Sequence, residues 1–166
     1  KYMKKRVVIT SLHFSPGFVG HMQAWYKMCE QCDIEPILLL SDGYGDFFCD
    51  GEYKYVTDIK TLNIFKPNFA VVQNTGFENI EFFKWCEKNN CKILFILHEP
   101  FMGIKELVKD GPYCLKQAGA CILNMWLCKK ADRVIICSNY AQANFNKYMK
   151  KFNRKMVRFP LIFLDE

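Results

Sequence analysis

Short apolar runs recur along the chain, and most are followed by a segment with helical spacing. Apolar residues stand at successive positions in these runs, and not only at every second position. A strand of this kind is buried on both faces, which is typical of a parallel sheet covered by helices. The pattern therefore predicts an α/β fold. The five main runs lie at residues 6–12, 36–40, 68–72, 92–97 and 133–137.

The segments between the runs complete the predicted order of elements. We expect a Rossmann-like doubly wound parallel sheet with helices on both faces, formed by one domain that spans residues 1–166. A short strand near 53–57 and a last strand at 156–159 join the main runs. The predicted helices lie at residues 20–32, 58–65, 77–90, 103–130 with a break at Gly111-Pro112, and 139–151.

Composition excludes several classes of protein. A chain of 166 residues with 51% apolar residues can bury a core, so disorder is not expected. No apolar run reaches 18 residues, and the N-terminus does not have the pattern of a signal peptide. A cytoplasmic location follows as the default.

Nine cysteines are scattered along the chain in apolar or helical patterns. Their odd number and irregular spacing do not form a disulfide framework, so we expect buried, reduced thiols. The one CxxC motif, Cys29 to Cys32, falls at the end of a predicted helix. A redox CxxC motif stands at the start of a helix, and a zinc site would need a second pair of ligands, which the sequence does not offer. We therefore expect neither a redox nor a metal-binding role for this motif.

The net charge of +6 is concentrated at the two ends. Residues 1–6 carry four cations, and residues 147–158 carry six cations and no acid, so the rest of the chain is mildly acidic. Such ends suit phospholipid head groups, nucleic acid or a phosphorylated substrate, or are simply solvated. The first residue is not Met, and residues 159–166 are apolar without a closing element. We therefore expect one domain of a longer protein.

In open α/β sheets, ligands bind beyond the carboxyl ends of the strands. All three histidines of the chain fall at this predicted edge. The candidate site residues are His13, Gly17, Gly20, His21, His98, Glu99, Ser138 and Asn139; Ser41, Asp42, Gln73, Asn74, Thr75 and Gly76 also follow strands.

Gly17 and Gly20 are two of the three glycines that a dinucleotide fingerprint needs. The stretch resembles the end of that fingerprint in extended short-chain dehydrogenases and sugar-nucleotide epimerases, and Asp42 is placed to meet a ribose. Phe14 stands where that family has its first glycine, and no Tyr is followed by Lys four residues later. An NAD-dependent enzyme is therefore a minor alternative, and a simple turn into the helix is another.

His98 and Glu99 close a strongly apolar run. His98 is a candidate base, hydrogen-bond donor or metal ligand, although one His and one Glu are too few to hold a metal. Local capping of the strand end is the alternative. Ser138 and Asn139 are candidates for a helix cap or an anion site. Neither a GxSxG nor a Walker motif occurs.

The ordered set of motifs resembles the N-terminal domain of a GT-B glycosyltransferase of the family 4 type. It comprises the glycine-bearing loop, Ile96-Leu97-His98-Glu99-Pro100, Ala131-Asp132-Arg133-Val134-Ile135-Ile136-Cys137-Ser138, and Phe159-Pro160-Leu161. The resemblance spans nearly the whole chain. It implies an acceptor-binding domain, with the donor-binding domain beyond Glu166, so this chain alone is expected to be inactive.

The resemblance also implies roles for the candidate residues. His98 would orient the acceptor, Gly20 and His21 would flank the donor diphosphate, and Ser138 and Asn139 would line the acceptor pocket. The family's adjacent Gly-Gly is replaced here by Gly17-Phe18-Val19-Gly20, so direct contact with phosphate is in question.

The partners that the resemblance implies are a nucleotide sugar and a sugar or lipid-linked acceptor from polysaccharide or glycolipid synthesis. The basic ends and the aromatic-rich amphipathic stretch 113–128 suggest peripheral attachment to an anionic membrane, where lipid-linked acceptors reside. No cofactor, metal or nucleic acid is expected. A noncatalytic Rossmann-like ligand- or partner-binding domain stays open as the alternative.

Overall fold

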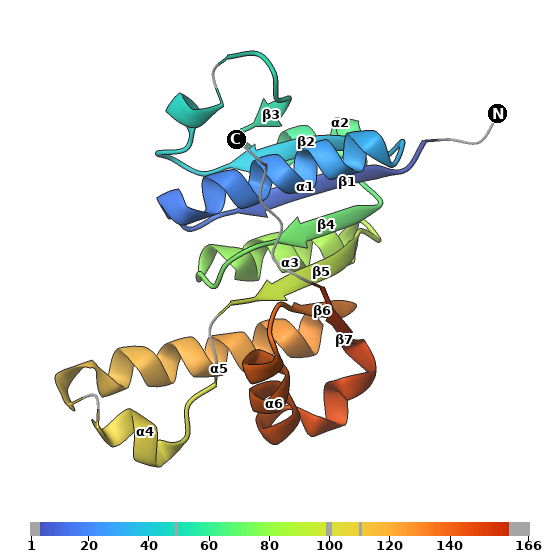
Figure 1. The fold of residues 1–166 in the computed structure, drawn as a ribbon. Coiled ribbons are helices and arrows are strands. Elements are labelled where there is room, and N and C mark those ends of the chain that lie inside the picture. The colour runs from blue at the N-terminus through green and yellow to red at the C-terminus, as the bar shows by residue number, and fades with distance from the viewer. Residues whose placement is uncertain (1–3, 49, 99–100, 110, 160–166) are drawn as a thin grey trace.

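The computed structural model describes residues 4–48, 50–98, 101–109 and 111–159. Its seven strands form one parallel sheet in the order β3-β2-β1-β4-β5-β6-β7 (Figure 1). This arrangement confirms the predicted Rossmann-like doubly wound fold. The strands are β1 Arg6–Ser11, β2 Glu35–Leu40, β3 Tyr55–Val56, β4 Phe69–Val72, β5 Lys92–Leu97, β6 Arg133–Ile136 and β7 Met156–Arg158.

Helices cover both faces of the sheet, as predicted, but they cover them unequally. Met22, Trp25 and Cys29 of α1 pack on one face with Ile9 and Val71. The opposite face is covered by α3, α5 and α6, which supply core residues such as Phe82, Leu127 and Phe145. The helices are α1 Val19–Gln31, α2 Leu62–Phe65, α3 Glu78–Lys88, α4 Ile104–Lys109, α5 Cys114–Lys130 and α6 Asn139–Tyr148.

The strand β1 lies between β2 and β4, and this is where the strand order reverses. Thr10 pairs with Leu39 on one side and with Val72 on the other, so the carboxyl ends of the three strands are level. Leu97 of β5 pairs with Ile136 of β6. The residues that follow these strands therefore meet along one edge of the sheet.

The break predicted at Gly111-Pro112 is confirmed. The segment 103–130 is divided between α4 and α5 at Gly111, whose backbone is left-handed with φ of 55°. The predicted helix 139–151 ends at Tyr148, and a 3-10 helix at Lys150–Lys155 follows it. Within the described residues, no helix is long and apolar enough to cross a bilayer.

The cysteines in the described part of the chain are all free thiols, and four of them are buried. Cys29 is buried in the end of α1, and this burial raises the pKa of its thiol to about 11. A thiolate is therefore not favoured at Cys29. Cys49 lies outside the described residues.

Candidate functional site

The loop that follows β1 is fixed by one buried tyrosine. The hydroxyl of Tyr44 accepts a hydrogen bond from the Ser15 backbone N–H at 2.9 Å and donates one to Ser11 Oγ at 2.8 Å. Tyr44 is fully buried, and its ring meets that of Phe14 edge to face with 4.9 Å between centroids. The path from β1 into α1 is therefore held by the segment that follows β2.

An aromatic cluster lies where the start of α1 meets the end of β5. The ring of His98 is 4.8 Å from the ring of Phe18 and 5.8 Å from that of His21, measured between centroids. His21 is buried in the first turns of α1, and His98 follows β5 directly. Two of the three histidines that were predicted at this edge are therefore in contact, although they are 77 residues apart in the sequence.

The surroundings of His98 decide its charge. Burial of the imidazole, and to a smaller extent the charge of nearby His21, lower the pKa of His98 to about 4. The ring is therefore neutral near pH 7. Its Nε2 is buried and has no hydrogen-bond partner within the described residues. A neutral imidazole with one open nitrogen can orient a hydroxyl, but it is a weak base because its conjugate acid is too strong.

The helix α1 begins beside this cluster and follows a 3-10 turn at Pro16–Phe18 directly. Phe18 is the N-cap residue, and no side chain caps the helix. At Gly17 and Gly20, no other part of the described chain lies within 4 Å of the point where a Cβ would stand, and neither residue has a positive φ. The fold itself thus does not require glycine at these two positions. Their small size leaves open space beside the backbone at the positive end of the helix dipole, although the Val19 N–H is already bonded to the Pro16 carbonyl.

Polar side chains that were not among the candidate site residues are buried at the same edge. Gln73 follows β4, and its backbone N–H extends the sheet by bonding to the Thr10 carbonyl. Strand alternation therefore points its side chain to the face that α1 covers, where Val71 also packs. Gln73 is fully buried, and neither atom of its amide has a hydrogen-bond partner within the described residues.

Next to Gln73, a hydrogen-bonded group ties the strand ends together. Asn74 donates to the carbonyl of His13, and Asn79 of α3 donates to the carbonyl of Asn74. Thr75 bonds to Asn124 of α5. These contacts bind the loop after β1 to the loop after β4, and they bind the loop after β4 to α3 and α5.

The remaining candidate residues are placed less centrally. His13 is exposed, and its carbonyl rather than its imidazole makes the hydrogen bonds described above. Ser138 caps α6, because its Oγ accepts a hydrogen bond from the Ala141 N–H at 3.1 Å. Asn139 is exposed in the first turn of α6. Glu99 lies outside the described residues.

The described residues contain no group of three or more His, Cys, Asp or Glu side chains that could hold a metal ion. The groups that the edge offers are the imidazoles of His21 and His98, side-chain amides and the backbone at a helix start. Such groups suit a ligand that combines hydroxyls with an anion, since imidazole and amide donors and a helix N-terminus can satisfy both.

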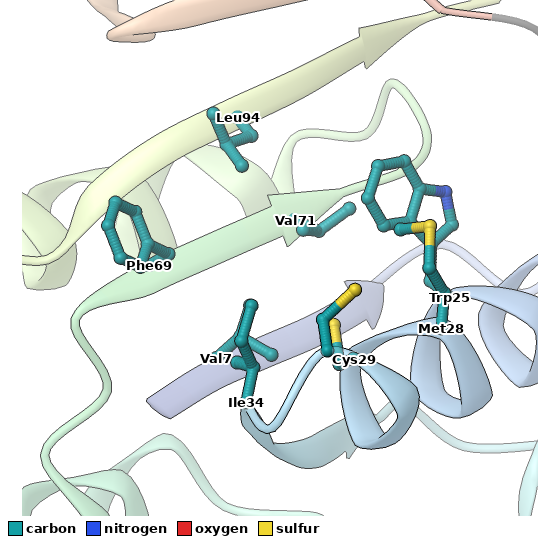
Figure 2. Close-up of a pocket in the computed structure, with 9 residues that line it drawn as sticks. Val7, Trp25, Met28, Cys29, Ile34, Phe69, Val71 and Leu94 are labelled. Carbon is teal, nitrogen blue, oxygen red and sulfur yellow. The ribbon is translucent and has the colours of Figure 1, made fainter. Parts of the chain in front are cut away.

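A pocket of about 250 Å³ lies elsewhere on the face that α1 covers (Figure 2). Trp25, Met28 and Cys29 of α1 line one side of it, and Val71 and Leu94 of β4 and β5 line the other. Its lining is apolar apart from the sulfur atoms, and it lies away from the strand ends. It offers no set of groups for a phosphate or a sugar, so the candidate site is at the carboxyl edge.

Comparison with known proteins supports the fold and leaves the family open. No protein-family model matches the sequence, and no curated protein matches it either. Among solved structures, the chain is similar to Staphylococcus aureus MnaA in its co-structure with UDP, with a TM-score of 0.61 and 16% sequence identity. The similarity covers 94% of this chain and 43% of the MnaA chain.

This chain therefore corresponds to less than half the length of that neighbour. At such low identity the likeness shows the fold alone. A second match is the dipicolinate-bound dihydrodipicolinate reductase from Paenisporosarcina sp. TG-14, with a TM-score of 0.44 and 18% identity over 84% of this chain and 49% of that one.

Proposed function

We propose that this chain is the acceptor-side domain of a nucleotide-sugar enzyme with a GT-B-like architecture, and more specifically of a glycosyltransferase. The observation that carries the proposal is the cluster of Phe18, His21 and His98 beside the uncapped start of α1. It joins hydroxyl-binding and anion-binding groups at the edge where Rossmann-like folds hold their ligands. The fold neighbour solved with UDP supports the choice of a nucleotide sugar.

In the proposed reaction, an acceptor hydroxyl attacks the anomeric carbon of the donor sugar. A carbon–oxygen bond forms there, and the bond to the nucleoside diphosphate breaks. The acceptor's proton leaves with the diphosphate or passes to water. His98 orients the acceptor hydroxyl through its open Nε2, since its lowered pKa makes it a poor base.

The donor diphosphate would lie near the start of α1. Backbone N–H groups of Gly20 and His21 would donate to its oxygens, and the helix dipole would favour the negative charge. The absence of side chains at Gly17 and Gly20 allows such an approach. The donor's sugar and base would be held mainly by a further domain, in keeping with the 43% of the MnaA chain that this fold covers.

Binding and turnover measurements test the proposal. The full-length protein is titrated by calorimetry with UDP-sugars, GDP-sugars and NAD, and sugar transfer to candidate acceptors is followed by mass spectrometry. We expect a nucleotide sugar to bind and NAD not to bind. His98→Asn should lower kcat about tenfold or more, and Lys88→Gln, a change on the exposed face of α3, should not. Binding of NAD alone would overturn the assignment.

A noncatalytic ligand-binding domain is the second candidate. The observation that favours it is the low pKa of His98 together with the use of Ser138 as a helix cap, which leaves the edge without a strong base or nucleophile among the described residues. Binding of a nucleotide sugar without transfer or hydrolysis by the full-length protein would select this alternative.

A further inference from the structure

The helix α4 and the first half of α5 form a lobe that extends beyond the sheet (Figure 1). We define the lobe as residues 104–109 and 111–122. No residue of α4 is buried, and the buried residues of α5 begin only at Leu123. The second half of α5 belongs to the core through Leu127 and Cys128. The lobe is thus a surface feature whose outer side chains the core does not use.

Large apolar side chains concentrate on this lobe. Within the described residues, eight large apolar side chains are about two-thirds or more exposed, and five of these belong to the lobe. Ile104 and Val108 are one turn apart on α4, and Leu115 and Ile122 are two turns apart on α5, so each pair lies on one face of its helix. Both helices therefore present an apolar stripe to solvent, which marks an interaction surface.

Lysines alternate with these apolar side chains. Three of the exposed apolar residues are each followed directly by an exposed lysine. Among the described residues, none of these three lysines forms a salt bridge, whereas Lys130 farther along α5 pairs with Glu87. The apolar–lysine pairs are Ile104-Lys105, Val108-Lys109 and Leu115-Lys116.

This alternation indicates the kind of partner. Lysine is depleted from the centres of protein–protein interfaces, where its charge would lose water without compensation. At a membrane surface the same pattern is favourable, because the apolar side chains enter the head-group region while the lysine stems extend to phosphates.

The neighbouring surface adds further positive charge. Lys147 of α6 and Glu106 of α4 line one pocket of about 370 Å³, so α6 borders the lobe. Residues 147–158 carry six cations and no acid. Near the start of β1, by contrast, Lys4 forms a salt bridge with Asp33, and Arg6 forms one with Glu35. The segment 147–158 thus adds positive charge next to the lobe, where Glu106 is the acidic side chain that shares the pocket with Lys147.

We propose that the lobe docks on an anionic lipid bilayer. The apolar stripes of α4 and α5 would enter the head-group boundary, and Lys105, Lys109 and Lys116 would contact lipid phosphates. The six cations of residues 147–158 would add a longer-range electrostatic attraction to the anionic lipids, and this attraction weakens as the salt concentration rises. The inference stands apart from the proposed sugar-transfer function, because it concerns a surface and not the strand-end site.

Vesicle co-sedimentation of the full-length protein tests this inference. Vesicles of phosphatidylcholine alone are compared with vesicles that also contain phosphatidylglycerol. We expect binding only to the second kind, and a loss of binding as salt is raised. Leu115→Ser with Ile122→Ser should weaken binding on the order of tenfold, and replacing Lys105, Lys109 and Lys116 by Gln should weaken it at least as much.

Matched controls use equally exposed positions away from the lobe. Ile64→Ser on α2 removes an apolar side chain that is 83% exposed, the same fraction as Leu115. Gln in place of Lys60, Lys84 and Lys88 removes three exposed lysines. These variants should bind anionic vesicles as the parent does. Equal binding to both vesicle types, equal effects of lobe and control changes, or lobe-dependent self-association without lipid would each overturn the proposal.

Discussion

The ring of His98 lies against the ring of Phe18, with 4.8 Å between their centroids. Phe18 is the N-cap residue of α1, so the start of this helix shields the imidazole that follows β5. The contact joins the first βα connection to the fourth main strand of the sheet. It explains why His98 is kept neutral at a position where a ligand would meet it.

Acid should destabilise the protein through His98. Its pKa is about 4 in the folded state and near 6.5 when unfolded, so the unfolded chain binds more protons between these values. Stability should fall as pH decreases from about 6.5 to about 4, by up to about 3 kcal/mol from this group. In His98→Gln this part of the fall should disappear. Urea unfolding at about pH 7 and about pH 4.5 measures it, and an unchanged slope in the variant would contradict the assignment.

Removing the Tyr44 hydroxyl should loosen the loop after β1. In Tyr44→Phe the Ser15 N–H and Ser11 Oγ lose their buried partner, which costs about 1–3 kcal/mol. Ligand binding at the start of α1 should weaken as well. The same change at Tyr55, which is exposed, should have little effect on unfolding. Equal unfolding midpoints for the two variants would show that the hydroxyl does not hold the loop.

Replacing Gln73 should separate stability from binding. Its amide is buried without hydrogen-bond partners among the described residues, so Gln73→Leu should leave stability unchanged or raise it by about 1 kcal/mol. If the amide serves the ligand, affinity for the nucleotide sugar should fall at the same time. Thermal unfolding and calorimetric titration provide the two readings. A variant that is clearly destabilised would mean that the amide has a structural partner.

The cap at Ser138 can be distinguished from a role in acceptor binding. Ser138→Ala removes the acceptor of the Ala141 N–H and should cost about 1 kcal/mol, whereas Ser138→Asp restores a capping oxygen. Both variants lack the hydroxyl. If Ser138 acts only as a cap, activity in Ser138→Asp should equal that of the parent, as measured beside the unfolding curves. A raised KM for the acceptor in Ser138→Asp, with normal stability, would favour contact with the acceptor.

Much of the fold could be predicted because its strands are buried on both faces. Val8, Leu38 and Ile136 belong to runs that have no polar alternation, and such runs, each followed by a helical pattern, indicate a covered parallel sheet. The break at Gly111 was also visible in the sequence as a turn signal. These features are local, so a single sequence carries them.

The site could be predicted only in part, because its contacts are not local. The sequence placed three histidines at one edge, but it could not show that His21 and His98 meet while His13 is exposed. That outcome depends on where the first turn of α1 crosses the sheet. Gln73 carried a usable signal, since a large polar residue directly after a buried strand has to be paired or functional.

The order of strands bears on how the protein forms during synthesis. The first strand to emerge from the ribosome, β1, takes an inner position in the sheet. Both of its neighbours are present once β2 and β4 have been made. From β4 onward every strand is added beside its predecessor, through β5, β6 and β7. The sheet can therefore grow outward from a finished centre as the ribosome advances, so the strand ends around the switch point can be ordered before the lobe and the basic segment have been made.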